Sequence, residues 1–368
     1  MARNGNKITV TVSNDIVTDQ RMERICSSLA GMGFEVEIVG RRLPDSLPLG
    51  VKEYQQSRLK LAFTKGPLFY AALNIRLLFY LLATKPDTIY TVDADSALAG
   101  IWTKKILKTK LIFDAHELFS EVPELQNRGI IKRIWQWIEK QIILKSDVRI
   151  TVSEGVANYY TNKYHKPFEV IRNISRTKTH LTANTSEKYI LYQGALNEGR
   201  GLEQLIMAAN NLDIKVKIAG DGDIAETLKK QAIANIEFLG KLVPDELEKV
   251  TTNAWLGYNL LEKRSLSYYY SLSNKTFDYI QAGIPQLIPD FPEYQKLNKE
   301  WNFGVIVGLS SEEIVKTVRQ LLEDQNLYSL LKVNAEKAGR VLTWENEEGK
   351  LTEIFDNFFE GFISLDKF

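Results

Sequence analysis

The chain has 368 residues, which is long for one hydrophobic core and makes two domains the expectation. Its 44% hydrophobic and 25% charged residues are ordinary for a globular protein, and a net charge of +1 without a basic run argues against nucleic acid as a partner. The single cysteine, Cys26, excludes an internal disulfide and favours a reducing compartment.

The charge is unevenly distributed along the chain. Residues 1–173 contain 25 Lys and Arg against 18 Asp and Glu, a net charge of +7, whereas the remainder contains 22 against 28, a net charge of −6. Such an asymmetry indicates two surfaces with different partners. Because MARNGNK leads directly into the strand-like ITVTV, no signal peptide is expected and a cytoplasmic protein is predicted.

Short β-rich runs alternate with helical patterns, which is typical of parallel sheets covered by helices. In the first half we predict strands near residues 8–12, 35–39, 88–92, 110–114, 147–152 and 169–171. An apolar run at 68–83 is short for a membrane span and contains Asn74 and Arg76, so a buried or interfacial helix is expected there. The polar, Thr-rich segment 174–187 is predicted to be a linker.

The same alternation of β-rich runs and helical patterns resumes after the linker. Strands are predicted at 189–193, 215–219, 236–239, 255–260, 286–288 and 305–307. The fold class is therefore α/β, with one doubly wound parallel sheet in a domain at 1–173 and another in a domain at 188–343. Within 344–368, a last helix near 346–363 carries a broad apolar face, which we expect to pack on the first domain.

The segment 273–285, SNKTFDYIQAGIP, carries chemistry suited to an anion. Ser273 is a candidate N-cap for a helix whose first turn contains Asn274 and Lys275, and Gly283 is expected to end that helix. Helix N-termini favour phosphate, and a lysine there adds a full positive charge. Lys275 and Asp278 are three residues apart and face the same way, which fits a nucleotide diphosphate and its ribose. An exposed Lys–Asp helix pair is the equally weighted alternative.

Three loops that follow predicted strands also carry polar or glycine-rich sequences. KLIFDAHE places His116 and Glu117 after one strand, IAGDGD places Gly220 and Gly222 after another, and GALNEGRG places Gly194 and Arg200 after a third. Ligands of open α/β sheets bind at the carboxyl ends of the strands, so these residues are candidates for one site. Taken alone, each has a simpler explanation. Gly220 and Gly222 fit a tight turn, Arg200 fits a solvated surface residue, and His116 fits a structural histidine.

The sequence resembles the retaining glycosyltransferases of family 4, which have the GT-B fold, two Rossmann-like domains facing each other across a cleft. The resemblance rests on the order and spacing of several strings that extend over nearly the whole chain. These are SNDIVTDQRMERICSSLAGMGFEVEIVGR, IFDAHELFSEVPEL, DVRITVSEGVANYY, YQGALNEGRGLEQLI, IAGDGD, IEFLGKL and SNKTFDYIQAGIP.

The resemblance implies roles for matching positions. Arg200 and Lys275 hold the diphosphate of a UDP- or GDP-sugar donor, Asp278 takes the ribose, His116 meets the donor sugar, and the backbone at Phe238 and Leu239 meets the base. The donor is held mainly by the second domain, where Gly194, Gly220, Gly222, Tyr270 and Asn274 are further candidates. The acceptor, a glycan or lipid-linked hydroxyl, is presented mainly by the first domain, towards Asp15, Arg21 and Glu117.

Two positions depart from the family pattern. The family commonly has two glutamates separated by seven residues, which here become Tyr270 and Asp278. A tyrosine cannot supply the carboxylate that a glutamate offers to the donor sugar. The arginine that often follows the glycine at Gly194 is Ala195, so the diphosphate has one cation fewer.

The implied reaction is a front-face transfer with retention, in which cations and helix amides stabilise the leaving diphosphate. No cofactor is expected, because the nucleotide-sugar is a substrate. Asp93 and Asp95 form an Asp-x-Asp string that could bind a divalent cation, but enzymes of this fold generally work without metal and none is predicted here. The resemblance also suggests a role in cell-surface polysaccharide or glycolipid synthesis.

Peripheral membrane contact at the inner face of the membrane is a further candidate. Residues 130–145, IIKRIWQWIEKQIILK, combine two tryptophans with four basic residues. The alternative is a crossover helix whose tryptophans are in the core.

Rival functions remain open from the sequence. A nucleotide-sugar epimerase of the same fold would need no acceptor, and a non-catalytic sugar- or nucleotide-binding protein is compatible with the missing glutamate at Tyr270. A nicotinamide dehydrogenase is disfavoured, because the first strand is followed by SNDIVTDQR and not by G-x-G-x-x-G.

Overall fold

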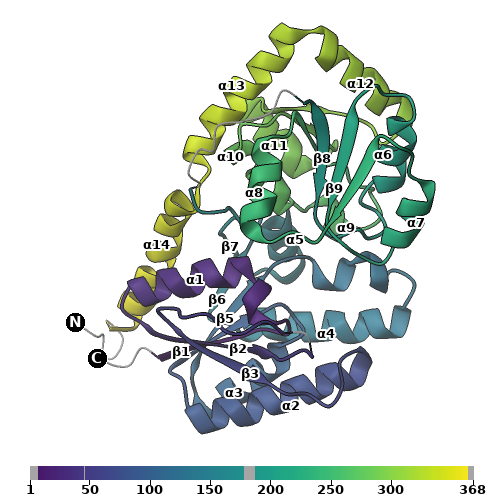
Figure 1. The fold of residues 1–368 in the computed structure, drawn as a ribbon. Coiled ribbons are helices and arrows are strands. Elements are labelled where there is room, and N and C mark those ends of the chain that lie inside the picture. The colour runs from purple at the N-terminus through teal and green to yellow at the C-terminus, as the bar shows by residue number, and fades with distance from the viewer. Residues whose placement is uncertain (1–6, 45, 178–186, 364–368) are drawn as a thin grey trace. The chain divides into compact units, whose positions relative to one another are not determined.

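A computed structural model describes residues 7–44, 46–177 and 187–363 of the protein and divides the chain into two compact units (Figure 1). The first unit comprises Met1–Asn173 and Glu348–Phe368, and the second comprises Ile174–Glu347. Each unit is built on one parallel sheet, so the predicted α/β class with two Rossmann-like domains is confirmed.

The first unit contains a seven-stranded parallel sheet in the order β3-β2-β1-β4-β5-β6-β7. Its strands are β1 Lys7–Thr11, β2 Glu35–Arg41, β3 Gln55–Leu59, β4 Thr88–Val92, β5 Lys110–Ala115, β6 Val148–Thr151 and β7 Glu169–Val170. Its helices are η1 Ile16–Thr18, α1 Gln20–Gly31, α2 Gly66–Thr84, α3 Ala97–Leu107, η2 Phe119–Glu121, η3 Pro123–Leu125, α4 Gly129–Lys145 and α5 Glu154–Tyr164.

Right-handed crossovers place the helices of this unit on both faces of the sheet. The connection from β1 to β2 runs towards one edge, whereas the connections through α2, α3 and α4 run towards the other edge. As a result α1 covers one face, and α2, α3 and α4 form a layer on the opposite face (Figure 1). Both faces are thus covered, which explains why every residue of β4 is buried.

The second unit contains a six-stranded parallel sheet in the order β10-β9-β8-β11-β12-β13. Its strands are β8 Tyr189–Gln193, β9 Lys215–Ala219, β10 Ile236–Gly240, β11 Leu256–Tyr258, β12 Gln286–Ile288 and β13 Gly304–Ile306. Its helices are α6 Leu202–Ala209, α7 Ala225–Gln231, α8 Pro244–Thr252, α9 Leu266–Tyr269, α10 Asn274–Gln281, α11 Pro292–Trp301, α12 Ser311–Glu323 and α13 Gln325–Val341. The last helix, α14 Trp344–Ile363, starts in this unit and from Glu348 belongs to the first.

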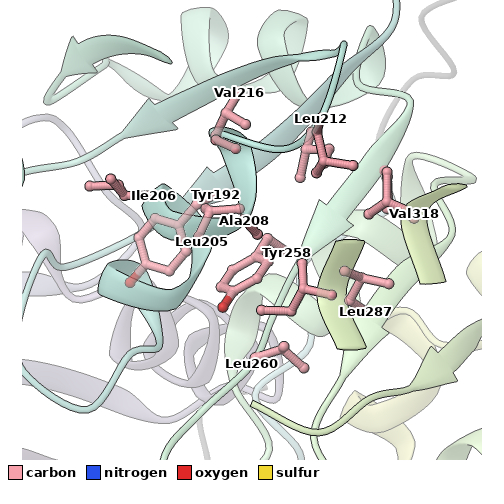
Figure 2. Packing of buried hydrophobic residues seen from close by; sticks show 14 of the residues in the cluster. Tyr192, Leu205, Ile206, Ala208, Leu212, Val216, Tyr258, Leu260, Leu287 and Val318 are labelled. Carbon is pink, nitrogen blue, oxygen red and sulfur yellow. The ribbon is translucent and has the colours of Figure 1, made fainter. Parts of the chain in front are cut away.

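Side chains of β8 alternate between the two faces of the second sheet. Ile190 and Tyr192 join a core cluster with α6 and β11, in which Figure 2 shows Tyr192 and Tyr258 among aliphatic side chains. Tyr189 and Leu191 join a separate cluster on the opposite face. A central strand buried on both faces leaves only its end free for polar contacts, and that end is where the site lies.

The strand predictions hold for twelve of the thirteen strands, with shifts of a few residues at the ends. The missed strand is β3, whose sequence QQSRL buries only Leu59. It is an edge strand that pairs with β2 alone, so it has no apolar run for a sequence pattern to detect.

The first residues of the predicted linker pack within the second unit. Ile174 is 1% exposed and packs in a core cluster of the second unit, and the carbonyl of Ser175 accepts hydrogen bonds from Trp344 N and Gln281 Nε2. These residues are fixed by packing that no sequence pattern shows. Residues 178–186 of the predicted linker lie outside the described residues.

The apolar face of α14 packs on the first unit from Glu348 onward. The Phe355 ring lies 5.8 Å from that of Phe34 and 6.5 Å from that of Tyr90, measured between ring centroids. The helix begins at Trp344, two residues before the predicted start.

Candidate functional site

The loops after β8 and β9 are interlocked at the carboxyl edge of the second sheet. Leu196 N donates to Asp221 O at 3.0 Å, and Ile224 N donates to Leu196 O at 3.0 Å. A Cβ on Gly220, whose φ is +147°, would lie 1.8 Å from Gly194 O, and a Cβ on Gly222 would lie 2.5 Å from Leu196 O. These contacts between loops therefore require both glycines, whether or not a ligand approaches them.

Lys275 is at the second position of α10, directly beside these loops. Its Nζ lies 3.7 Å from the centroid of the Tyr192 ring and 3.6 Å from where a Cβ on Gly194 would stand. The residue is 7% exposed, and its Nζ has no hydrogen-bond partner in the part of the chain that the structure describes. The alternative of an exposed Lys275–Asp278 pair is therefore wrong, because the lysine is buried and does not bind the carboxylate.

Burial, followed by the nearby positive charge of Arg200, holds the pKa of Lys275 well below its usual value. The guanidinium carbon of Arg200 lies 4.8 Å from the centroid of the Tyr268 ring. Its Nε is also buried without a hydrogen-bond partner among the described residues. Lys275 and Arg200 are thus near each other, and each packs against an aromatic ring. An anion between them would accept hydrogen bonds from both side chains.

The start of α10 differs from the expected cap. Ser273 is the N-cap residue, but its hydroxyl makes no capping hydrogen bond to the helix. It donates instead to Asn259 Oδ1 at 2.7 Å and accepts from Tyr294 Oη at 3.0 Å. Asn259 also donates to Thr276 Oγ1 at 2.8 Å, so a buried side-chain network fixes the helix start. Gly283, with φ +67°, follows the C-cap as expected.

Asp278 lies one turn beyond Lys275 and is half-buried. Its Oδ1 accepts from Ser175 Oγ at 2.9 Å, and its Oδ2 accepts from Gln193 Nε2 at 3.0 Å. Gln193 is fixed in turn by Thr251 Oγ1, which donates to its Oε1 at 2.7 Å.

Other predicted donor residues belong to the same unit. Phe238 and Leu239 are half-buried in β10, where the pairing with β9 shifts register between Phe238 and Gly240. Tyr270 is the C-cap of α9, and its ring lies 5.1 Å from that of Tyr269. Asn274 is the exposed first residue of α10.

In the first unit, Arg21 and Asp114 form a buried ion pair. Arg21 Nε and Nη2 donate to Asp114 Oδ2 and Oδ1 at 3.1 and 3.0 Å, and its Nη1 donates to Ile171 O at 2.8 Å. Arg21 is 2% exposed and Asp114 is 0% exposed. Its guanidinium is therefore buried and engaged inside the unit, and the expectation that Arg21 lies towards an acceptor stays a prediction.

His116 lies between two carboxylates at the end of β5. Its Nε2 is 3.3 Å from Asp114 Oδ2, its Nδ1 is 3.8 Å from Asp93 Oδ2, and its backbone N donates to Asp93 Oδ1 at 2.8 Å. Burial lowers the pKa of His116, but the charges of Asp114 and Asp93 outweigh it and raise the pKa to about 9. The imidazole is thus held in a fixed orientation, and its Nε2 also lies 3.1 Å from Arg21 Nε.

Two other acidic residues predicted near the acceptor also have contacts within this unit. Asp15 is 8% exposed, accepts from Val17 N at 3.3 Å and lies 3.6 Å from Arg58 Nη1. Glu117 is half-buried, and its carbonyl accepts from Tyr160 Oη at 3.2 Å.

The Asp-x-Asp string, Asp93 and Asp95, has hydrogen bonds of its own within the unit. Asp95 accepts a short hydrogen bond from Ser13, and burial raises the pKa of Asp95 to about 6 and that of Asp93 to about 8. Over the described ranges, no group of three or more His, Cys, Asp or Glu side chains is arranged to hold a metal ion.

The sequence did not single out the aromatic and amide side chains around the two cations. Tyr192 and Tyr268 face Lys275 and Arg200, and Gln193 orients Asp278. The signal available for them was position alone, since Tyr192 and Gln193 are the last residues of a central strand.

Comparisons with known proteins agree with this arrangement. The family model described as Glycosyltransferase Family 4 matches residues 20–176, and the model described as Glycosyl transferases group 1 matches residues 173–338. Comparison with the curated proteins gives no match.

Several solved structures share the fold. Sucrose-phosphate synthase from Thermosynechococcus elongatus aligns with a TM-score of 0.81 at 14% identity, over 97% of this chain and 100% of that one. HepE from Anabaena, in complex with UDP and glucose, aligns with a TM-score of 0.76 at 12% identity, over 96% and 100%. A putative UDP-N-acetylglucosamine 2-epimerase from Listeria monocytogenes aligns with a TM-score of 0.66 at 12% identity, over 96% and 97%.

Together the two family models cover residues 20–338 and therefore both parallel-sheet units. The chain belongs to the group 1 glycosyltransferases, with a family 4 N-terminal domain and the GT-B fold.

Proposed function

We propose that this glycosyltransferase moves a hexosyl or related sugar from a nucleotide-sugar to a hydroxyl of a glycan or lipid-linked acceptor, with retention at the anomeric carbon. UDP is the first candidate nucleotide, because HepE of the same fold is described with UDP and with UDP-glucose. GDP is the second. Cell-surface polysaccharide or glycolipid synthesis in the cytoplasm is the biological setting that fits such an acceptor.

The observation that carries the proposal is the unsatisfied Nζ of buried Lys275. A buried amine without a hydrogen-bond partner is costly, so a site that retains one is prepared for a counter-charge. Arg200 adds a second cation that depresses the pKa of Lys275 in the empty protein. A diphosphate would accept a hydrogen bond from Lys275 Nζ and would also offset the repulsion between Lys275 and Arg200.

The same two cations account for catalysis in this proposal. As the bond from sugar to diphosphate breaks, negative charge grows on the leaving oxygen, and prearranged cations in a low-dielectric site stabilise it. The acceptor hydroxyl gives its proton to the leaving diphosphate on the same face. No side-chain nucleophile is required.

Asp278 is assigned to the ribose hydroxyls. Ser175 and Gln193 each donate to one of its oxygens and thereby fix the carboxylate plane. The backbone at Phe238 and Leu239 is assigned to the base. Tyr270 occupies the position of the usual family glutamate, and we assign to it an altered recognition of the donor sugar.

In the first unit, His116 is assigned to the donor sugar, as a cationic hydrogen-bond donor. Asp15 and Glu117 are retained as acceptor-side residues. The reaction is proposed to need no metal and no cofactor.

The direct test is a thermal-shift screen with UDP-, GDP- and ADP-sugars, followed by product analysis with acceptors. Binding to the native state alone raises the melting temperature by an amount that grows with ligand concentration. We expect one nucleotide to stabilise the protein and a chelator to leave turnover unchanged. Isomerised sugar without acceptor would show an epimerase, and binding without turnover on any acceptor would show a binding protein. Either result would overturn the proposed transfer.

A further inference from the structure

The outer layer of the first unit, formed by α2, α3 and α4, exposes an unusual amount of apolar surface. Its exposed large apolar residues, with their exposed fractions, are Leu68 59%, Ile75 50%, Phe79 65%, Trp102 38%, Ile106 57%, Ile130 77%, Ile131 38%, Ile134 53%, Trp137 56% and Leu144 42%. We call this layer the α2–α4 face. The three helices pack side by side, and the rings of Tyr70 and Trp135 join α2 to α4 at 4.9 Å between centroids.

The exposed residues of α4 follow one stripe along the helix. Ile130, Ile134 and Trp137 lie on it, with exposed Arg133 between the first two and exposed Lys140 one turn after Trp137. Trp135, Ile138 and Ile142 lie on the opposite side and are buried. Trp135 is therefore in the core, as the crossover-helix alternative expects, whereas Trp137 is exposed to solvent, as a membrane-contacting helix requires.

The charge on this face has one sign. The three helices contain seven basic residues, Arg76, Lys104, Lys105, Lys132, Arg133, Lys140 and Lys145, and a single acidic one, Glu139. Glu139 is 0% exposed and accepts from Tyr160 Oη at 3.1 Å and Tyr164 Oη at 2.7 Å, so it does not reach the surface.

Most of these cations form no ion pair within the part of the chain that the structure describes. Lys104 pairs with Asp147 and Lys132 with Glu121. The other five make no ion pair with any described residue. Apolar side chains interspersed with cations that form no ion pair with a described residue, on helices whose one carboxylate is buried, match the chemistry of one partner, a lipid surface with anionic headgroups.

The hydrogen bonds of α2 argue against its crossing a membrane. By length and composition it could span a membrane, with a mean hydropathy of 1.4, yet only 28% of that stretch is buried in the protein. Polar side chains on the other side of α2 make hydrogen bonds within the first unit. Asn74 Nδ2 donates to Asp95 O at 2.7 Å and Asn74 Oδ1 accepts from Ala99 N at 3.0 Å, while Tyr80 Oη donates to Glu37 and contacts Ser57. Spanning a bilayer would break these contacts.

We propose that the α2–α4 face binds the anionic leaflet of a membrane, with Trp137 inserted at the interface and the unpaired Lys and Arg on the headgroups. This binding does not require the proposed reaction, but it would hold the enzyme at the surface where a lipid-linked acceptor resides. Each cation near an anionic leaflet is worth roughly fivefold in affinity, and salt screens it.

The test is flotation of the full-length protein with vesicles of phosphatidylcholine alone or of phosphatidylcholine mixed with phosphatidylglycerol. We expect binding only to the mixed vesicles, weakened in high salt. Arg133→Glu with Lys140→Glu should reduce it by roughly tenfold or more, and Trp137→Ser should reduce it without changing its salt dependence. Lys316→Glu with Lys337→Glu, the same charge change at exposed positions of the second unit, is the matched control.

Circular dichroism reports whether each variant is folded, and the thermal shift with UDP-sugars reports whether it still binds the donor. Failure of lipid binding can therefore be distinguished from failure of the proposed sugar transfer. No flotation of the wild type, or equal loss in the control variant, would overturn the lipid proposal. Sedimentation velocity tests whether a second copy of the protein, and not a lipid surface, covers the α2–α4 face. A wild-type dimer that Trp137→Ser converts to monomer would show that a second copy covers this face and would also overturn it.

Discussion

Lys275 Nζ lies 3.7 Å from the centroid of the Tyr192 ring and, among the residues that the structure describes, has no hydrogen-bond partner. The aromatic face supplies part of the stabilisation that water would give the ammonium. A ring cannot replace three hydrogen-bond acceptors, so the amine remains available to an anion. The proposed donor site depends on this relationship.

Lys275→Met keeps the length of the side chain and removes its charge. We expect the affinity for the donor nucleotide to fall roughly ten- to a hundredfold, because a charged hydrogen bond contributes about 1.5–3 kcal/mol. Turnover should fall at least about tenfold with the fold intact. Titration calorimetry with UDP and steady-state rates measure both effects, and Lys316→Met on exposed α12 is the control. Unchanged affinity and rate would remove Lys275 from the diphosphate site.

The same lysine predicts a pH dependence of stability in the ligand-free protein. Burial, and then Arg200, holds the pKa of Lys275 well below its usual value in the folded state, whereas the unfolded chain has the ordinary lysine value of about 10.4. Between these two pKa values the unfolded state binds more protons, so rising pH stabilises the wild type relative to Lys275→Met. Urea unfolding of both proteins at several pH values measures the difference. A difference independent of pH would contradict the lowered pKa.

His116 predicts the opposite trend. Its pKa is raised to about 9 because Asp114 and Asp93 outweigh the effect of burial. Its contribution to stability is therefore full below the unfolded pKa of about 6.5 and is lost as pH rises towards the folded pKa. The wild type should lose stability relative to His116→Gln across that window. An NMR titration of the imidazole checks the pKa directly, and a midpoint near or below 6.5 would rule out the proposed cationic role at neutral pH.

Arg21→Met tests whether Arg21 is structural. We expect it to lower the free energy of unfolding by about 3–5 kcal/mol, because the buried Asp114 carboxylate loses its arginine and keeps only Tyr90 and His116 as side-chain partners. Lys52→Met, which breaks an exposed ion pair with Glu23, should cost less than about 1 kcal/mol. Denaturant unfolding measures both. A stable Arg21→Met protein with a raised KM for acceptor would support the acceptor assignment.

Gly220→Ala tests the contact between the loops after β8 and β9. The new Cβ would meet Gly194 O, so we expect a loss of at least about 2 kcal/mol in stability. Gly240→Ala is the matched control, since Gly240 also has a positive φ, +67°, but no atom lies within 4 Å of the added Cβ. It should cost about 1 kcal/mol from backbone strain alone. Equal losses in the two variants would show that the loop contact contributes little.

Much of the architecture was readable from sequence because burial leaves a pattern. Central strands covered on both faces are largely apolar runs, so β4 and β8 were predicted at their observed bounds. The edge strand β3 and the packed residues Ile174 and Ser175 were missed, because their environment comes from partners distant in the chain.

The sequence by itself determined the fold class, the family and the position of Lys275 at a helix start, since these follow from local periodicity and spacing. Only the tertiary structure decided that Lys275 is buried with no hydrogen-bond partner at Nζ among the described residues, and that Arg21 is paired with Asp114. It also decided that Trp137 is exposed to solvent and Trp135 is buried. Charge and helical spacing are local properties of a chain. Burial and partnership depend on which distant segments fold against a residue, and they decide whether a cation is structural or free to bind.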